Sequence, residues 1–122
     1  MKILLTSLPY FDNSYQVHKE MQSGIGYRIL RSGNLNAQKK IYPICDLLYT
    51  AALLKNNNFN LVVDDDQFLQ SKNFNEYSDN LSKKCGVPDI VIVRTSLPTI
   101  NSDLEIAQKL KLKWKKAKFF VY

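Results

Sequence analysis

The sequence predicts an α/β fold in which helices cover both faces of a parallel β-sheet. Its apolar runs are short and continuous, as in strands buried on both faces, and segments with helical spacing of apolar residues separate them. Strands that alternate with helices along a chain pair in parallel through right-handed crossovers. With 122 residues the chain is long enough for one hydrophobic core, so we treat residues 1–122 as a single domain.

The first predicted strand is KILLTS, residues 2–7, which Pro9 closes. Beyond it no helical or alternating period persists until about residue 41, and three glycines interrupt the stretch. We therefore expect a loop over residues 9–41, inserted after the first strand. Loops of this length inside compact domains are uncommon and are usually functional or mobile.

The next segment predicts a helix followed by a strand. Apolar residues recur at the spacing of one helix face, and Pro43 fits the first turn, where a missing N–H costs nothing. The residues of this face are Ile44, Leu47, Leu48, Ala51 and Ala52. Residues 55–58 end the helix, and NLVVD, residues 60–64, is typical of a short buried strand. We interpret the three aspartates at 64–66 as a solvated strand end and turn.

A second helix is predicted by the spacing of Phe74, Tyr77, Leu81 and Cys85. Gly86 follows, where a left-handed C-terminal cap is needed. The second helix should therefore end at this glycine.

The four β-branched residues at 90–93 predict the next strand. Ser102 and Glu105 then form a capping box, so a third helix should run from there to about Lys116. The last residues, KFFVY at 118–122, predict a fourth strand.

This succession of elements fits a doubly wound sheet with strand order 2-1-3-4, as in flavodoxin-like folds. The last element of the sequence is a strand. A final parallel strand normally needs a following helix to cover it. We therefore expect a truncated domain, the front part of a longer polypeptide.

Composition and charge limit the classes of binding partner that fit this chain. Hydrophobic residues make up 45% and charged residues 23%, as in ordinary globular proteins. The formal net charge is +6, and six lysines fall between residues 109 and 118, mostly on one face of a predicted helix and without interleaved aromatic residues. We interpret them as a solvated helix face, with a phosphate-binding stripe as the alternative, and expect no nucleic-acid partner.

No segment approaches the roughly 20 apolar residues that cross a bilayer, and the N-terminal apolar run is too short for a signal peptide. We expect a cytoplasmic location and no membrane partner. The two cysteines, Cys45 and Cys85, lie on apolar faces of predicted helices and have no metal-ligand spacing, so we interpret both as reduced core thiols.

In a sheet of this order, ligands bind beyond the carboxyl ends of the strands, where the strand order reverses between strands one and three. The residues that follow these two strands are candidates for ligand binding. They are Ser7, Pro9, Tyr10, Arg94, Thr95, Ser96, Leu97 and Pro98. We predict no catalytic residue and no metal ligand among them.

Several other chemistries do not fit these positions. A phosphate-accepting receiver domain needs acidic residues after strand one and an aspartate after strand three, where this chain has Ser7 and Arg94. Neither a GxGxxG nor a GxxxxGK phosphate loop is present. His18 is the only histidine, and we interpret it as a loop residue.

The segment PICDLLYTAALLKNNNFNLVVDDDQ, residues 43–67, resembles the first helix and second strand of the cobalamin-binding domain at the N-terminus of cobalamin-dependent radical SAM enzymes. KILLTSLPYF at 2–11 resembles the first strand of that domain, PDIVIVRTSLPT at 88–99 the third, and residues 100–122 the following helix and strand. The chain departs from the family at residues 56–58, three asparagines where glycine is usual, and at Arg94, where a small or polar residue is more common.

The resemblance implies a corrinoid across the carboxyl ends of the strands. Ser7, Thr95 and Ser96 would then donate hydrogen bonds to corrin amides, and Arg94 would bind the nucleotide-tail phosphate or an acidic neighbour. Pro9, Tyr10, Leu97 and Pro98 would give flat apolar contact. The Asp-x-His-x-x-Gly motif that supplies a cobalt-binding histidine in other cobalamin domains is absent.

The resemblance further implies a downstream radical SAM domain of the same polypeptide, which would hold S-adenosylmethionine and an iron-sulfur cluster and transfer a methyl group. Its CxxxCxxC run is absent here, so we expect this chain alone to be non-catalytic. Two alternatives stay open: a non-catalytic flavodoxin-like interaction module without cofactor, and a flavin-binding domain, for which the residues after strand one are poorly suited.

Overall fold

Strands and helices alternate along the chain as the sequence predicts. The computed structural model describes residues 1–9, 45–65, 71, 73–95 and 100–122. The elements are β1 (Lys2–Ser7), α2 (Cys45–Asn56), β2 (Asn60–Asp65), α3 (Phe74–Cys85), β3 (Ile90–Arg94), α4 (Ile100–Lys113) and β4 (Lys118–Val121). The predicted loop over 9–41, apart from Pro9, lies outside the described residues.

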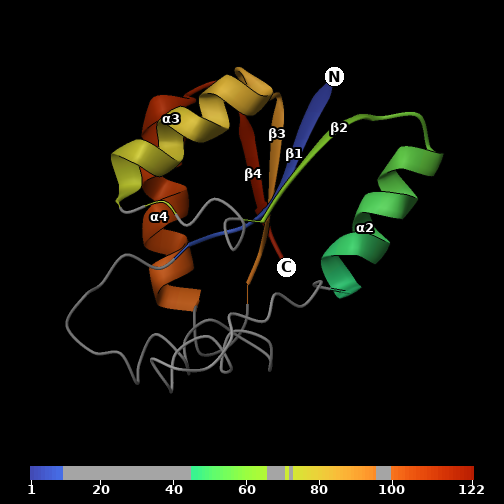
Figure 1. Cartoon of the computed structure of the whole chain (residues 1–122), viewed down its shortest axis with the longest axis horizontal. Coiled ribbons are helices and arrows are strands. Elements are labelled where there is room, and N and C mark those ends of the chain that lie inside the picture. The colour runs from blue at the N-terminus through green and yellow to red at the C-terminus, as the bar shows by residue number, and fades with distance from the viewer. Residues whose placement is uncertain (10–44, 66–70, 72, 96–99) are drawn as a thin grey trace, which may run out of the picture.

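The four strands form one parallel sheet with the order β2-β1-β3-β4, so the predicted flavodoxin-like arrangement is confirmed (Figure 1). Strand β1 lies in the middle, and Leu4 pairs in register with Val62 on one side and Val91 on the other. Its residues from Ile3 to Ser7 are all buried, as the continuous apolar run predicts. Strand β2 lies at the edge, and Leu61 to Val63 are only half-buried.

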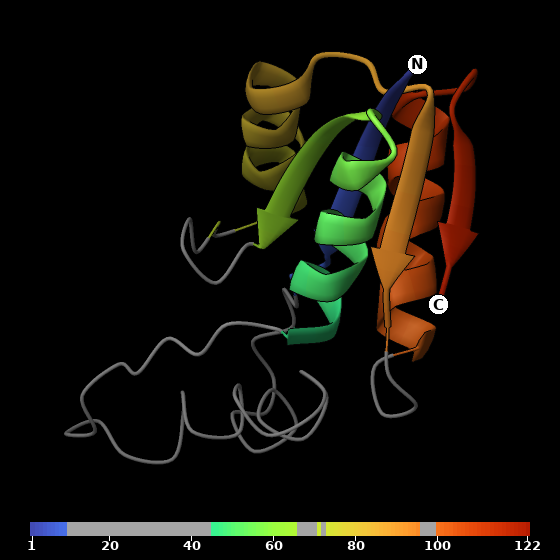
Figure 2. The ribbon, with the colours of Figure 1, turned by 90° about the vertical axis from the view of Figure 1, so that its right-hand side faces the viewer.

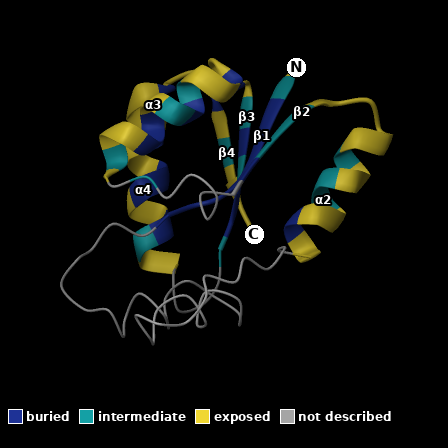
Figure 3. Cartoon of the chain, viewed as in Figure 1, coloured by how far each residue is buried: buried dark blue, intermediate teal, exposed yellow. Residues whose placement is uncertain are grey.

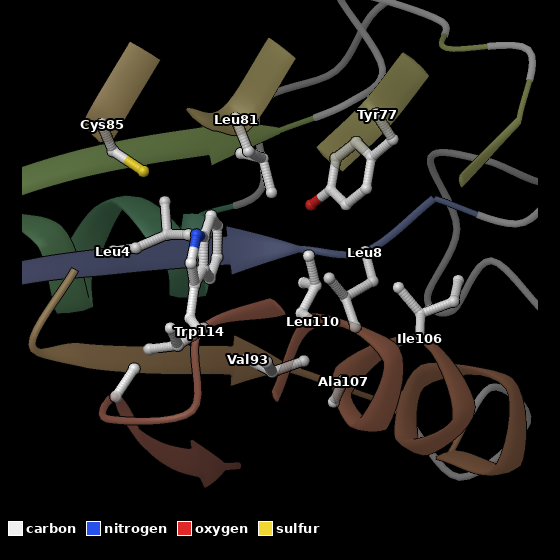
Figure 4. Packing of buried hydrophobic residues seen from close by; sticks show 12 residues of the cluster. Leu4, Leu8, Tyr77, Leu81, Cys85, Val93, Ile106, Ala107, Leu110 and Trp114 are labelled. Atoms are coloured by element: carbon white, nitrogen blue, oxygen red, sulfur yellow. The ribbon is translucent and has the colours of Figure 1, made fainter. Parts of the chain in front are cut away.

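Helices α3 and α4 cover one face of the sheet, and α2 covers the other (Figures 1 and 2). The larger core lies under α3 and α4, where the Trp114 ring lies beside Leu4 and Tyr77 lies nearer Leu8 (Figure 4). Its buried members are Leu4, Leu8, Tyr77, Leu81, Cys85, Val91, Val93, Ile106, Ala107, Leu110, Trp114 and Ala117. This face holds most of the apolar surface removed from water, which is the main stabilising term.

The opposite face has a smaller core beneath α2. Leu5 and Leu47 are its buried residues, and Leu47 is the buried residue of α2. The predicted apolar face of this helix is partly wrong, because Leu48 is 52% exposed and Ala52 is also exposed. Most of α2 is exposed (Figure 3). Helix α2 packs mainly over β1 and β2, so it buries fewer of its side chains than the apolar spacing in its sequence predicts.

Two residues with positive φ end the first two described helices. Asn58, at φ 61, follows α2, and its N–H donates to the Lys55 carbonyl. Asparagine tolerates the left-handed region, so Asn58 can end the helix without a glycine. Gly86, at φ 65 and ψ −138, caps α3 and donates its N–H to the Ser82 carbonyl, in a conformation almost restricted to glycine.

Helix α4 differs from its predicted bounds. It begins at Ile100, so Ser102 lies inside the first turn, and the predicted capping box at Ser102 and Glu105 is wrong. The helix ends at Lys113, and residues 115–118 with their three lysines lie in the turn and at the start of β4. With 14 residues it is the longest described helix, and none in this part of the chain is long and apolar enough to cross a membrane.

The interpretation of both cysteines as core thiols is wrong for Cys45. Cys85 is buried, whereas Cys45 begins α2 and is exposed. Burial raises the pKa of the Cys85 thiol, and the nearby Lys2 opposes this effect.

The interpretation of the aspartates as a solvated strand end is wrong for Asp64. Its side chain is fully buried on the α3 side of the sheet, and its Oδ1 accepts a hydrogen bond from Lys84 Nζ at 2.9 Å. Among the described residues, its Oδ2 has no hydrogen-bond partner. Asp66 lies outside the described residues.

A second buried polar contact joins Thr6 of β1 to Tyr77 of α3, with 3.0 Å between the two hydroxyl oxygens. We expect Thr6→Val or Tyr77→Phe alone to lower the free energy of unfolding by about 1–2 kcal/mol, because each substitution leaves the buried hydroxyl of the other residue without its hydrogen-bond partner. The double variant should cost less than the sum of the two. Urea unfolding measures all three, and strictly additive losses would contradict a specific hydroxyl pair.

The two thiols should react at different rates in the native protein. We expect a thiol reagent at pH 8 to label Cys45 rapidly and Cys85 only on unfolding, because Cys85 is buried and its pKa is raised. Mass spectrometry of peptides from a time course locates the label. Rapid native labelling of Cys85 would contradict the packing of α3.

Candidate functional site

The candidate site lies at the carboxyl edge of the sheet, between β1 and β3. After β1 the chain leads to α2 on one face, and after β3 it leads to α4 on the other (Figure 2). Ligands of open parallel sheets bind beyond such a point, where neighbouring connections leave in opposite directions. The fold therefore brings the predicted residues after β1 and β3 to one edge.

Ser7 and Arg94 are direct neighbours at this edge. They are register partners at the ends of β1 and β3, so their side chains leave the same face of the sheet. Both residues are 5% exposed. Parallel pairing thus joins two polar residues that lie far apart in the sequence.

Arg94 is held by an acidic neighbour. Its Nε donates to Asp46 Oδ2 at 2.8 Å, and Asp46 lies in the first turn of α2. The arginine side chain is 5% exposed and the aspartate side chain 49% exposed. The pair neutralises a buried guanidinium and fixes α2 against β3.

Thr95 makes a comparable contact on the other face. Its hydroxyl donates to Asp103 Oδ2 at 2.6 Å, and Asp103 is buried in the first turn of α4. The N–H of Thr95 also donates to the carbonyl of Tyr122. The end of β3 is therefore tied to a helix on each face of the sheet, through Arg94 and Thr95.

Tyr122 completes the edge on the side of α2. Its backbone continues the pairing of β4 with β3, since its N–H donates to the Val93 carbonyl. Burial raises the pKa of its phenol; Asp46 acts in the same direction, and Thr50 and Arg94 oppose it. The phenol therefore stays neutral at physiological pH and can both donate and accept a hydrogen bond.

Of the eight predicted site residues, the structure describes Ser7, Pro9, Arg94 and Thr95, and brings them to one edge. Pro9 is buried. The predicted alternative of an acidic neighbour for Arg94 is confirmed by Asp46. Tyr10, Ser96, Leu97 and Pro98 lie outside the described residues.

Sequence reasoning missed Asp46, Asp103 and Tyr122. Each acidic residue lies in the first turn of a predicted helix, where the helix dipole stabilises a carboxylate. This local explanation gave no reason to expect that the two carboxylates also contact the end of β3. Arg94 and Asp46 are separated by 48 residues, and no local pattern marks such a pair. Within the described residues, no group of three or more His, Cys, Asp or Glu side chains can hold a metal ion.

Comparisons with known proteins do not identify a family: no protein-family model, no curated protein and no solved structure matches this chain.

The contact between Arg94 and Asp46 predicts a specific loss of stability. We expect Asp46→Asn to lower the free energy of unfolding by about 1–3 kcal/mol, because it leaves a buried guanidinium without its charge partner. Amide hydrogen exchange in α2 should accelerate more than in α4. Urea unfolding and exchange mass spectrometry measure the two effects.

Asp79→Asn is the matched control. Asp79 pairs with Lys113 at 3.0 Å, but its side chain is 67% exposed, so the same substitution should change stability by less than about 0.5 kcal/mol. Equal losses in the two variants would show that Asp46 contributes no more than a surface charge.

Proposed function

We propose that this chain is a cobalamin-binding domain that holds a corrinoid at the carboxyl edge between β1 and β3 and presents it to a radical SAM domain for methyl transfer. The observation that carries the proposal is the strand order β2-β1-β3-β4, with Ser7 and Arg94 side by side at the switch point. When bound, the corrinoid supplies the cobalt chemistry, and the domain supplies position and polar contacts.

The polar groups at this edge fit a ligand with a neutral rim. Asp46 neutralises Arg94, so the edge offers no free buried cation among the described side chains. Corrin side chains are uncharged amides, which can donate to the half-exposed Asp46 carboxylate and accept from hydroxyl groups.

Ser7 would accept or donate one hydrogen bond at the ring edge, and Pro9 would supply apolar contact. His18, the only histidine in the sequence, lies outside the described residues, so no cobalt ligand is assigned. Tyr10, Ser96, Leu97 and Pro98 remain candidates from the sequence alone.

The second candidate function is a non-catalytic interaction module. The observation that favours it is the apolar surface beside α2 on its side of the sheet. Phe120 of β4 is 54% exposed. Phe120 pairs in register with Ile92, and Ile92 belongs to the small core under α2, so this surface extends that core toward β4.

Titration of the purified chain with hydroxocobalamin, followed by gel filtration and an absorbance spectrum of the protein peak, tests the proposal. We expect the corrinoid to co-elute with the chain in stoichiometric amount. A folded chain that elutes without colour would overturn cobalamin binding and leave the interaction module as the better assignment.

A pair of serine variants locates the ligand. Ser7→Ala should raise the dissociation constant for hydroxocobalamin about threefold to tenfold, the usual effect of one lost hydrogen bond. Ser78→Ala is the matched control, because Ser78 is equally buried but lies on α3 and bonds the Asn75 carbonyl. Equal affinities of the two variants would remove the end of β1 from the site.

A further inference from the structure

The amino edge of the sheet, opposite the candidate site, is basic. All strands of a parallel sheet start at the same edge, and the described helices return to it at their C-termini (Figures 1 and 2). We use the term basic edge for the lysines at the starts of β1 and β4, at the end of α3 and in the turn after α4. They are Lys2, Lys83, Lys84, Lys115, Lys116 and Lys118.

Few carboxylates balance these charges. Lys84 pairs with the buried Asp64, and Lys2 Nζ donates to the Cys85 carbonyl at 2.8 Å. Asp89 is the acidic residue at this edge, and its Oδ2 accepts from the Lys2 N–H and lies 3.9 Å from the N-terminal ammonium.

The other four lysines of the basic edge, Lys83, Lys115, Lys116 and Lys118, are exposed. Across the part of the chain that the structure describes, none of them forms an ion pair with a carboxylate. Asp46 and Asp103 lie at the carboxyl edge. Among the described residues, the basic edge therefore carries a net positive charge.

Exposed apolar side chains accompany the lysines. Val87 is 68% exposed, in the turn that Gly86 opens between α3 and β3. Leu112 is 72% exposed and lies one turn before Lys115 and Lys116. Phe59, 37% exposed, precedes the start of β2. A charged surface interspersed with protruding apolar residues is typical of proteins that lie on membrane surfaces.

We propose that the basic edge binds the surface of an anionic lipid bilayer. Each lysine near such a surface raises the binding affinity by a factor of about five. Exposed apolar side chains can enter the headgroup region. The expectation of no membrane partner rested on the lack of a spanning segment, which surface binding does not require.

Nucleic acid is the less suitable polyanion. The basic edge carries lysines, whereas the described arginine, Arg94, is at the other edge, and base or phosphate recognition favours the arginine fork. The most exposed apolar residues among the lysines, Val87 and Leu112, are aliphatic and cannot stack on bases.

Co-sedimentation with vesicles tests the proposal. We expect the chain to bind phosphatidylcholine vesicles that contain about 30% phosphatidylserine at low salt, not to bind pure phosphatidylcholine, and to dissociate as salt rises. Absence of binding to the anionic vesicles would overturn the proposal. Tighter binding to a DNA or RNA oligonucleotide than to these vesicles would overturn it in favour of nucleic acid.

Two lysine variants make the test specific. Lys116→Glu should weaken vesicle binding at least about fivefold. Lys109→Glu changes the net charge equally, but Lys109 lies over the ring of Phe74 at the start of α3, away from the basic edge, and should bind nearly as the parent chain does. Equal weakening would show that only net charge matters and would overturn a defined surface.

A second pair of variants tests the apolar contact. Val87→Ser should weaken vesicle binding without altering charge, whereas Leu48→Ser, at an exposed position of α2, should not. Circular dichroism confirms that each variant is folded. The basic edge and the cobalamin edge are opposite, so failure of either proposal leaves the other standing.

Discussion

Burial of β1 on both faces is the constraint on which the rest of the fold depends. Leu4 and Leu5 are adjacent and both fully buried, yet they point to opposite faces. Leu4 belongs to the core under α3 and α4, and Leu5 to the core under α2. A strand with this pattern must pair on both sides and be covered on both faces, which requires the crossovers that the chain makes.

The two faces are unequal, and the inequality explains where polar contacts are used. The α3 and α4 face is closed by large side chains such as Trp114 and Leu110, with the hydroxyl pair of Thr6 and Tyr77 inside it. The α2 face has little buried apolar area, and α2 is fixed additionally by the ion pair of Asp46 and Arg94. The same contact lies at the candidate site, so residues that stabilise α2 also form part of that site.

Sequence patterns predicted the element order because it follows from burial periodicity and short-range turn chemistry. The strand order was predicted from the flavodoxin-like arrangement that this element order fits. Gly86 ends α3 where the sequence placed a cap. The start of α4 was misplaced because Ser102 and Glu105 match a capping pattern by spacing alone. The exposure of Cys45 and Leu48 was not predicted. Periodicity identifies the apolar face of a helix, but it does not tell how much of that face packs against the sheet.

Long-range polar pairs mark the limit of prediction from one sequence. The edge that unites Ser7 and Arg94 followed from topology, but their neighbours Asp46 and Tyr122 did not. Asp64 was read as a solvated residue because nothing local indicates that Lys84, 20 residues away, will pair with it. Such contacts depend on helix placement to within a few ångströms, which hydrophobic spacing does not determine.

The sparse packing of α2 also bears on how the molecule unfolds. With Leu47 as its buried residue, α2 is the described helix with the least buried surface, so its detachment would leave the core under α3 and α4 intact. Such an opening would expose Leu5 and Ile92 next to the already exposed Phe120, a continuous aliphatic and aromatic strip across three parallel strands. Detachment of α2 alone would therefore uncover a surface suited to association between copies of the chain, and we expect resistance to aggregation to depend on how firmly this helix stays attached.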